Sequence, residues 1–142
     1  MKRLIMIAVV AMLFTVGARP YRRYTRAEQD VDRQMDYIWS CCVKRGIPDW
    51  DENGITNCCD KAVSFIREWR RVYSREIRLC QQTTLQLNHM YVQVKMDWGW
   101  WSVDPAWSYD GTHDMQKVWG NQYRDGADMS DAYWVRYFSR WL

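Results

Sequence analysis

The hydrophobic pattern of this chain changes its period near Glu76, and this change limits the possible folds more than any other feature. Before it, apolar residues recur at spacings of three and four, which indicates amphipathic helices. After it, Met90, Val92, Val94 and Met96 alternate with their neighbours, which is typical of a half-buried strand. We therefore expect an α+β domain with N-terminal helices packed on an antiparallel β-sheet.

The first helix has clear start and stop signals. Thr25 and Glu28 form the pattern of a capping box, and apolar residues follow at helical spacing from Val31 to Cys42. Gly46 and the proline two residues later end the helix. The residues from 48 to 54 are polar and close with an Asn-Gly turn signal, so we expect a loop there.

The second helix is predicted to begin at Cys58. Asn57 is a suitable N-cap, and Asp60 stands where a carboxylate favours the free amides and the helix dipole. One apolar stripe then follows at helical spacing, made of Ala62, Phe65, Ile66, Trp69, Val72 and Tyr73.

Three strands are expected after the second helix. They cover Ile77–Gln82, His89–Met96 and Trp100–Val103, with a turn at Asp97–Gly99 between the last two. Asp104-Pro105 ends the third strand, because proline cannot donate to a ladder.

The C-terminal part is less regular. The residues from His113 to Trp119 favour a short helix. The residues from Tyr133 to Phe138 fit either a strand or a helix, and the pattern leaves both open.

The first eighteen residues read as a targeting segment. A basic start, Met1–Arg3, precedes an apolar run from Leu4 to Val16 that is short for a membrane span. Small residues around Gly17 predict cleavage after Ala18. We therefore expect a signal peptide (1–18), a single domain (19–142), and export to the periplasm or the extracellular space without a stable membrane anchor. An uncleaved anchor is the alternative.

Composition excludes several classes of protein. The chain is 48% hydrophobic and 26% charged, which is the mixture of a globular domain rather than a disordered one. Its formal charge of +3 is too small to indicate a nucleic-acid partner.

The five cysteines are informative because export implies an oxidising compartment, where disulfides persist. They are Cys41, Cys42, Cys58, Cys59 and Cys80. An odd number leaves at least one thiol unpaired within the chain, and two disulfides with one free cysteine would fit. The sequence leaves the pairing open.

Cys58, His89 and Asp104 form the constellation best suited to chemistry. A helix N-terminus lowers the pKa of a thiol, and a histidine in reach stabilises the thiolate and can protonate a leaving group. A carboxylate behind the imidazole fixes its tautomer. The predicted hairpin would place the histidine and the carboxylate on neighbouring antiparallel strands.

The surrounding motifs resemble those of the transglutaminase-like superfamily, a branch of the papain-like cysteine enzymes. Asn57-Cys58-Cys59-Asp60-Lys61-Ala62 resembles its nucleophile motif, His89-Met90-Tyr91-Val92-Gln93-Val94 its histidine strand, and Trp100-Trp101-Ser102-Val103-Asp104-Pro105 its Trp-x-x-Val-Asp-Pro motif. The likeness covers residues 54–107. It departs from the family pattern at Thr56 and Asn57, which replace the usual Gly-Asp, and at Tyr91, which replaces a common Trp.

The resemblance implies a transglutaminase-like core and a Cys58-His89-Asp104 triad acting by thioester acyl transfer on amide or peptide substrates. It selects Cys58 over Cys59, because alanine follows the family's nucleophile by four residues. Hydrolysis and amine transfer both fit this chemistry. We expect oxyanion donors at the start of the Cys58 helix and in the preceding loop, near Trp50.

The expected partner is a protein or peptide substrate, which includes a cell-wall peptide. No cofactor and no metal are expected, because no pair of Cys or His residues has ligand spacing. His113 is expected to be an ordinary surface residue. The alternative function is a catalytically silent binding or structural domain, in which Cys58 is held in a disulfide with Cys41, Cys42 or Cys80.

Overall fold

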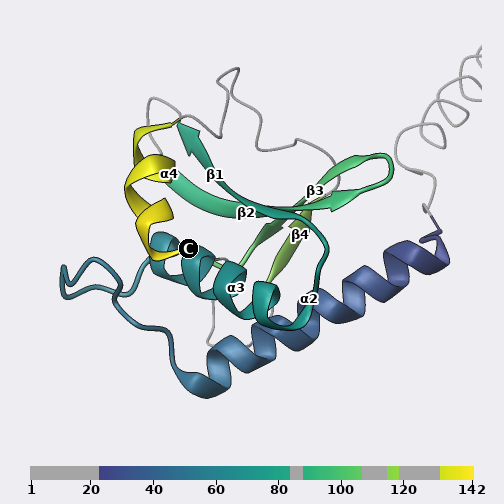
Figure 1. The fold of residues 1–142 in the computed structure, drawn as a ribbon, viewed down its shortest axis with the longest axis horizontal. Coiled ribbons are helices and arrows are strands. Elements are labelled where there is room, and N and C mark those ends of the chain that lie inside the picture. The colour runs from purple at the N-terminus through teal and green to yellow at the C-terminus, as the bar shows by residue number, and fades with distance from the viewer. Residues whose placement is uncertain (1–22, 84–87, 107–114, 119–131) are drawn as a thin grey trace, which may run out of the picture.

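The computed structural model describes residues 23–83, 88–106, 115–118 and 132–142. Two helices, α2 (Arg26–Arg45) and α3 (Cys58–Val72), precede four strands. A short helix, α4 (Tyr133–Phe138), and a 3-10 turn, η1 (Ser139–Trp141), follow the strands. Helices packed against an antiparallel sheet confirm the α+β prediction (Figure 1). The predicted signal peptide lies outside the described residues.

Helix α2 begins and ends where the sequence predicts. Thr25 caps it, since its hydroxyl accepts from the Glu28 amide at 3.2 Å while the Glu28 carboxylate accepts from the Thr25 amide at 2.7 Å. At the other end, Gly46 has a φ of 76°, which a residue with a side chain rarely adopts. Both ends of the helix are thus set by local sequence.

The sheet has the order β1-β2-β3-β4, and all its pairs are antiparallel. Its strands are β1 (Ile77–Thr83), β2 (Asn88–Met96), β3 (Gly99–Asp104) and β4 (Gln116–Val118). Strands β2 and β3 form the predicted tight hairpin, in which Met96 pairs with Gly99.

The main core lies between the sheet and the helices. Helix α3 packs against β1 and β2 and against α2 (Figure 1). Its buried aromatic residues, Phe65 and Trp69, stack on each other at 6.1 Å. Burying such side chains stabilises the fold by about 1.5–3 kcal/mol each. The predicted stripe therefore holds the helix in place. Its last two members are exceptions, since Val72 is exposed and Tyr73 is only partly buried.

The prediction of a half-buried β2 is wrong, because this strand is buried on both sides. Tyr91 and Gln93, expected to face solvent, are both buried. Gln93 is accommodated by a polar network. Its side-chain carbonyl accepts from Arg78 at 2.9 Å and its amide donates to Ser102 at 3.1 Å. Buried polar groups need such partners.

The C-terminal predictions are partly corrected. Residues Gln116–Val118, expected within a helix, form β4, while the rest of the segment 113–119 is outside the described residues apart from Met115. Pairing with the edge of β3 satisfies backbone hydrogen-bonding groups of these three residues, which favours the strand. Lys117 of this strand also forms ion pairs with Asp32 and Asp36 of α2, each at 2.6 Å.

The residues Tyr133–Phe138, for which strand and helix were both open, form helix α4. Val135 and Phe138 are buried in the main core. Among the described helices, none is long and apolar enough to cross a membrane.

Candidate active site

Cys58 is the first residue of α3, as the sequence predicts. The Asn57 side chain accepts from the Cys59 amide at 2.8 Å, and the Asp60 carboxylate accepts from the Asn57 amide at 2.9 Å. This reciprocal cap satisfies groups at the helix start that have no partner within the helix. The thiol of Cys58 therefore sits at a well-defined positive end of a helix dipole.

Asp60 also attaches the preceding loop to α3. Its second oxygen accepts from the Trp50 amide at 2.8 Å, and the Trp50 indole N–H donates to Ser64 at 2.9 Å. Both N–H groups of Trp50 are thus engaged within the fold. The second oxyanion donor expected near Trp50 is therefore neither of the N–H groups of Trp50 itself.

The strand register brings His89 and Asp104 onto one face of the sheet. Val92 pairs with Val103, so one step further along the ladder Tyr91 lies opposite Asp104. His89 is two residues from Tyr91 and shares its face, which is the diagonal arrangement that long side chains can bridge.

The two side chains meet in a buried contact. His89 Nε2 lies 2.5 Å from Asp104 Oδ2, and these residues are only 7% and 0% exposed. The other carboxylate oxygen of Asp104 accepts from the Ala106 amide at 2.9 Å. The carboxylate is therefore held in place and in turn orients the imidazole.

The Cys58 sulfur completes the arrangement from the other side of His89. Hydrogen bonds from the Cys59 thiol, from His89 and from the Met90 amide outweigh the effect of burial and lower the pKa of Cys58 to about 4. Because Asp104 occupies Nε2 of His89, the remaining ring nitrogen is the one available to the sulfur. The structure thus brings together the three residues that the sequence singled out.

His89 shows the complementary shift. Burial acts to lower its pKa, but the hydrogen bonds and charges of Asp104 and Cys58 outweigh burial and raise the pKa to about 9. Between these two values the pair carries a thiolate and an imidazolium. This is the protonation state that a cysteine nucleophile with a histidine acid requires.

Cys59 has a different environment from its neighbour. Its hydrogen bond to Cys58, together with burial, raises the pKa of the Cys59 thiol well above its ordinary value. It therefore remains a protonated donor beside the Cys58 thiolate. This difference agrees with the choice of Cys58 as the nucleophile.

None of the five cysteines is in a disulfide. Cys80 is buried with Tyr91 in a small cluster apart from the main core, where its thiol donates to Gln93 at 3.3 Å. Cys42 belongs to the main core, and burial and the charge of Glu68 raise its pKa to about 12. The structure therefore contains neither of the two disulfides that the cysteine count allowed, and it places Cys42 and Cys80 in different buried clusters.

A pocket of about 330 Å³ opens onto Cys58. Its walls include Asn88 and Met90 of β2 and the aromatic side chains of Trp134 and Phe138 from α4. Sequence analysis missed the α4 residues as part of the site. Only their aromatic character pointed to them, and nothing in the linear order related residue 134 to residue 58.

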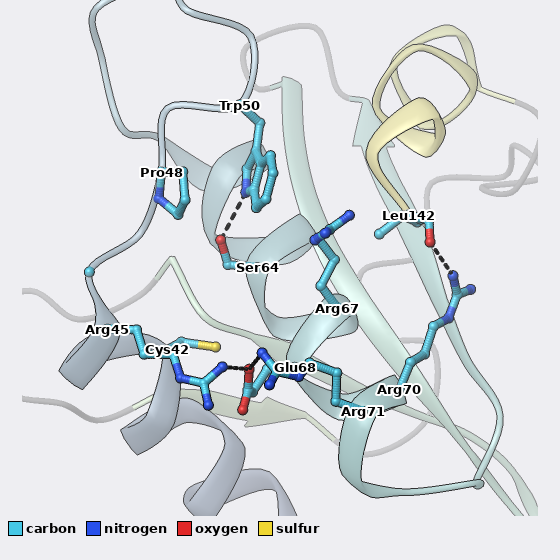
Figure 2. Close-up of a pocket in the computed structure, with 11 residues that line it drawn as sticks. Cys42, Arg45, Pro48, Trp50, Ser64, Arg67, Glu68, Arg70, Arg71 and Leu142 are labelled. Carbon is cyan, nitrogen blue, oxygen red and sulfur yellow. Dashed lines mark hydrogen bonds and ion pairs between the residues drawn. The ribbon is translucent and has the colours of Figure 1, made fainter.

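A larger pocket, of about 470 Å³, lies along α3 (Figure 2). It is basic, since Arg45, Arg67, Arg70 and Arg71 line it with one carboxylate, that of Glu68. Arg45 donates to Glu68 at 2.8 Å, and Arg70 donates to a backbone carbonyl of Leu142 at 3.3 Å. Cys58, His89 and Asp104 are not among the residues that line it.

Comparison of this chain with protein-family models, with curated proteins and with solved structures yields no match.

Proposed function

We propose that this protein is a transglutaminase-like cysteine enzyme that transfers acyl groups from amide or peptide substrates to water or to an amine. The observation that carries the proposal is the position of His89 between the Cys58 sulfur and a carboxylate oxygen of Asp104 at 2.5 Å. The three sequence motifs described above support the same assignment.

In the first half of the reaction, the Cys58 thiolate attacks the substrate carbonyl carbon and forms a tetrahedral oxyanion. The carbon–nitrogen bond then breaks, and the His89 imidazolium gives its proton to the departing amine. The products are a thioester on Cys58 and a neutral imidazole. Asp104 stabilises the charged ring and keeps Nε2 directed away from the sulfur.

In the second half, neutral His89 takes a proton from water or from an acceptor amine, which attacks the thioester carbonyl. The carbon–sulfur bond breaks and returns the thiolate, while His89 is again protonated. The released product is an acid after hydrolysis or a new amide after amine transfer.

The oxyanion needs donors near the sulfur. The Cys59 amide already donates to Asn57, so the backbone amide of Cys58 is the candidate at the helix start. The pocket of about 330 Å³ suits one substrate side chain rather than a folded surface. Its aromatic wall and its asparagines favour an amide-bearing segment of a peptide or protein.

The test is the pH dependence of Cys58 alkylation by iodoacetamide, followed residue by residue with peptide mass mapping. The proposal expects a midpoint near pH 4 in the wild type and a midpoint at least about one pH unit higher in His89→Ala. The midpoint is the appropriate measure because a thiolate of low pKa is also a weaker nucleophile.

His113→Ala is the matched control, since the chain contains only these two histidines. It should leave the midpoint unchanged. A wild-type midpoint of about 8.5, which is the ordinary pKa of a thiol, would contradict the proposal. Equal midpoints in wild type and His89→Ala would contradict it as well.

A turnover assay separates the enzyme from the silent binding domain. Hydrolysis releases ammonia or new amino termini from casein, and amine transfer incorporates a fluorescent primary amine, with Cys58→Ala as the blank. A reactive Cys58 without turnover of either kind would favour the binding domain.

A further inference from the structure

The loop between α2 and α3 has a second pattern that the triad does not use. Asp49, Asp51 and Asn53 alternate, Gly54 follows, and Asp60 stands eleven residues after the first aspartate. In helix–loop–helix calcium sites, oxygen ligands come from positions one, three, five and twelve of the loop, with glycine at position six. The pattern matches each of these positions, with aspartate in place of glutamate at the last.

The fold brings the three carboxylates of this pattern together. One oxygen each from Asp49, Asp51 and Asp60 lies within 4.8 Å of the other two. Asp49 also accepts from the Asn53 amide at 3.2 Å and from the Gly54 amide at 2.6 Å, which folds the loop around it.

The electrostatics of this cluster call for a cation. Asp60 is 0% exposed, and within the described ranges no lysine or arginine forms an ion pair with it or with the other two aspartates. Oδ1 of Asp51 is itself buried and has no hydrogen-bond partner in the part of the chain that the structure describes. The amides of Trp50 and Asn57 and the positive end of α3 already stabilise the Asp60 carboxylate. Oδ1 of Asp51 has no such partner within the described ranges, and burying a negative oxygen without one is costly.

We propose that the loop Asp49–Asp60 is a calcium site, with Asp49, Asp51 and Asp60 as its carboxylate ligands. A donor set made only of oxygens suits a hard divalent cation, and twelve-residue ligand spacing is that of calcium. The side-chain NH₂ group of Asn53 donates to Asp51 at 3.0 Å, and the side-chain oxygen of Asn53 accepts from the backbone amide of Ile55 at 2.8 Å. Asn53 becomes a further ligand when its side chain gives up these two hydrogen bonds and its oxygen binds the cation.

The site has a structural consequence for α3. Asp60 holds the amides of Trp50 and Asn57, at 2.8 and 2.9 Å, and Asn57 caps the helix that begins with Cys58. A cation on Asp60 therefore fixes the loop against the helix start. The proposal does not rest on the enzymatic function, and its test uses binding and stability alone.

The experiment is calcium titration of the chelator-treated protein by calorimetry, together with thermal unfolding in EGTA and in calcium. Wild type is expected to bind one Ca²⁺ and to melt about 5 °C higher at a calcium concentration near ten times the dissociation constant. Mg²⁺ at the same concentration gives a smaller shift, because it demands octahedral geometry and releases water reluctantly.

Asp51→Asn tests the ligand set, and Glu52→Gln is its matched control. Both variants remove one negative charge from the same loop, but Glu52 is exposed and outside the carboxylate cluster. Asp51→Asn should lower calcium affinity about tenfold or more, while Glu52→Gln should change it little. In EGTA, Asp51→Asn should melt no lower than wild type, because it removes an uncompensated charge.

The proposal is overturned if wild type shows no calcium-dependent heat or melting shift. It is also overturned if Mg²⁺ shifts the melting temperature as much as Ca²⁺, or if the two variants lose affinity equally. Equal loss would mean general attraction to an acidic loop.

Discussion

At the scale of single residues, the main feature is an imidazole held between two negatively charged groups. Asp104 raises the proton affinity of His89, and His89 in turn helps to keep Cys58 ionised. The sequence was sufficient to select these three residues, since their types and order carry the motif. It could not supply the 2.5 Å contact, which depends on the strand register.

The pH dependence of turnover should reflect both shifts. The competent form needs a thiolate on Cys58 and a proton on His89. It is therefore lost below the Cys58 pKa of about 4 and above the His89 pKa of about 9. We expect a bell-shaped profile of kcat/KM with a broad plateau between these limits. A profile with a single limb near pH 6.5 would mean that His89 titrates without its two partners.

Asp104→Asn should lower the pKa of His89 by about one unit or more, because it removes the charge that favours the imidazolium while burial remains. Asparagine can still accept from the Ala106 amide, so the turn after β3 should persist. The measurement is an NMR titration of the ring protons, with His113 as an internal reference that should not move. An unchanged His89 titration would show that Asp104 does not control the ring.

At the scale of elements, the helix ends are local and therefore predictable. Thr25 with Glu28, and Asn57 with Asp60, form capping boxes within four residues of sequence. Burial of β2 is different, because the polar partners of Gln93 come from two neighbouring strands. Alternation along one strand cannot indicate what covers its second face.

The two caps offer a paired test. Thr25→Ala and Asn57→Ala should each lower the free energy of unfolding by about 1 kcal/mol. Only Asn57→Ala should also raise the pH midpoint of Cys58 alkylation, because only that cap positions the helix start beside the sulfur. Chemical denaturation and alkylation profiles of both variants check this. A midpoint change in Thr25→Ala of similar size would mean that loss of stability, not the cap, alters Cys58.

At the scale of the whole molecule, the fold is held together by packing rather than by cross-links. All five cysteines are free, although export would favour disulfides. Buried thiols such as Cys42 and Cys80 instead fill apolar or hydrogen-bonded positions. The cysteine count alone could not distinguish these roles, because pairing depends on distance in space.

The melting temperature should therefore be the same with and without a reducing agent such as dithiothreitol. Thiol counting on the denatured, unreduced protein should find five free groups. Calorimetry in both buffers gives the comparison. A fall of several degrees on reduction would indicate a cross-link that contributes to stability.

Local sequence was enough to predict the parts that depend on near neighbours: the two capped helices, the β2–β3 hairpin and the chain order of Cys58, His89 and Asp104. The spacing of Asp49, Asp51 and Asp60 was also present in the sequence, although the expectation of no metal rested on the spacing of Cys and His alone. Tertiary packing decided that β4 covers the edge of β3, that Trp134 and Phe138 of α4 border the Cys58 pocket, and that Cys42 and Cys80 lie in different buried clusters. These features join residues far apart in the chain, and their free energy comes from packing and pairing that no local pattern encodes.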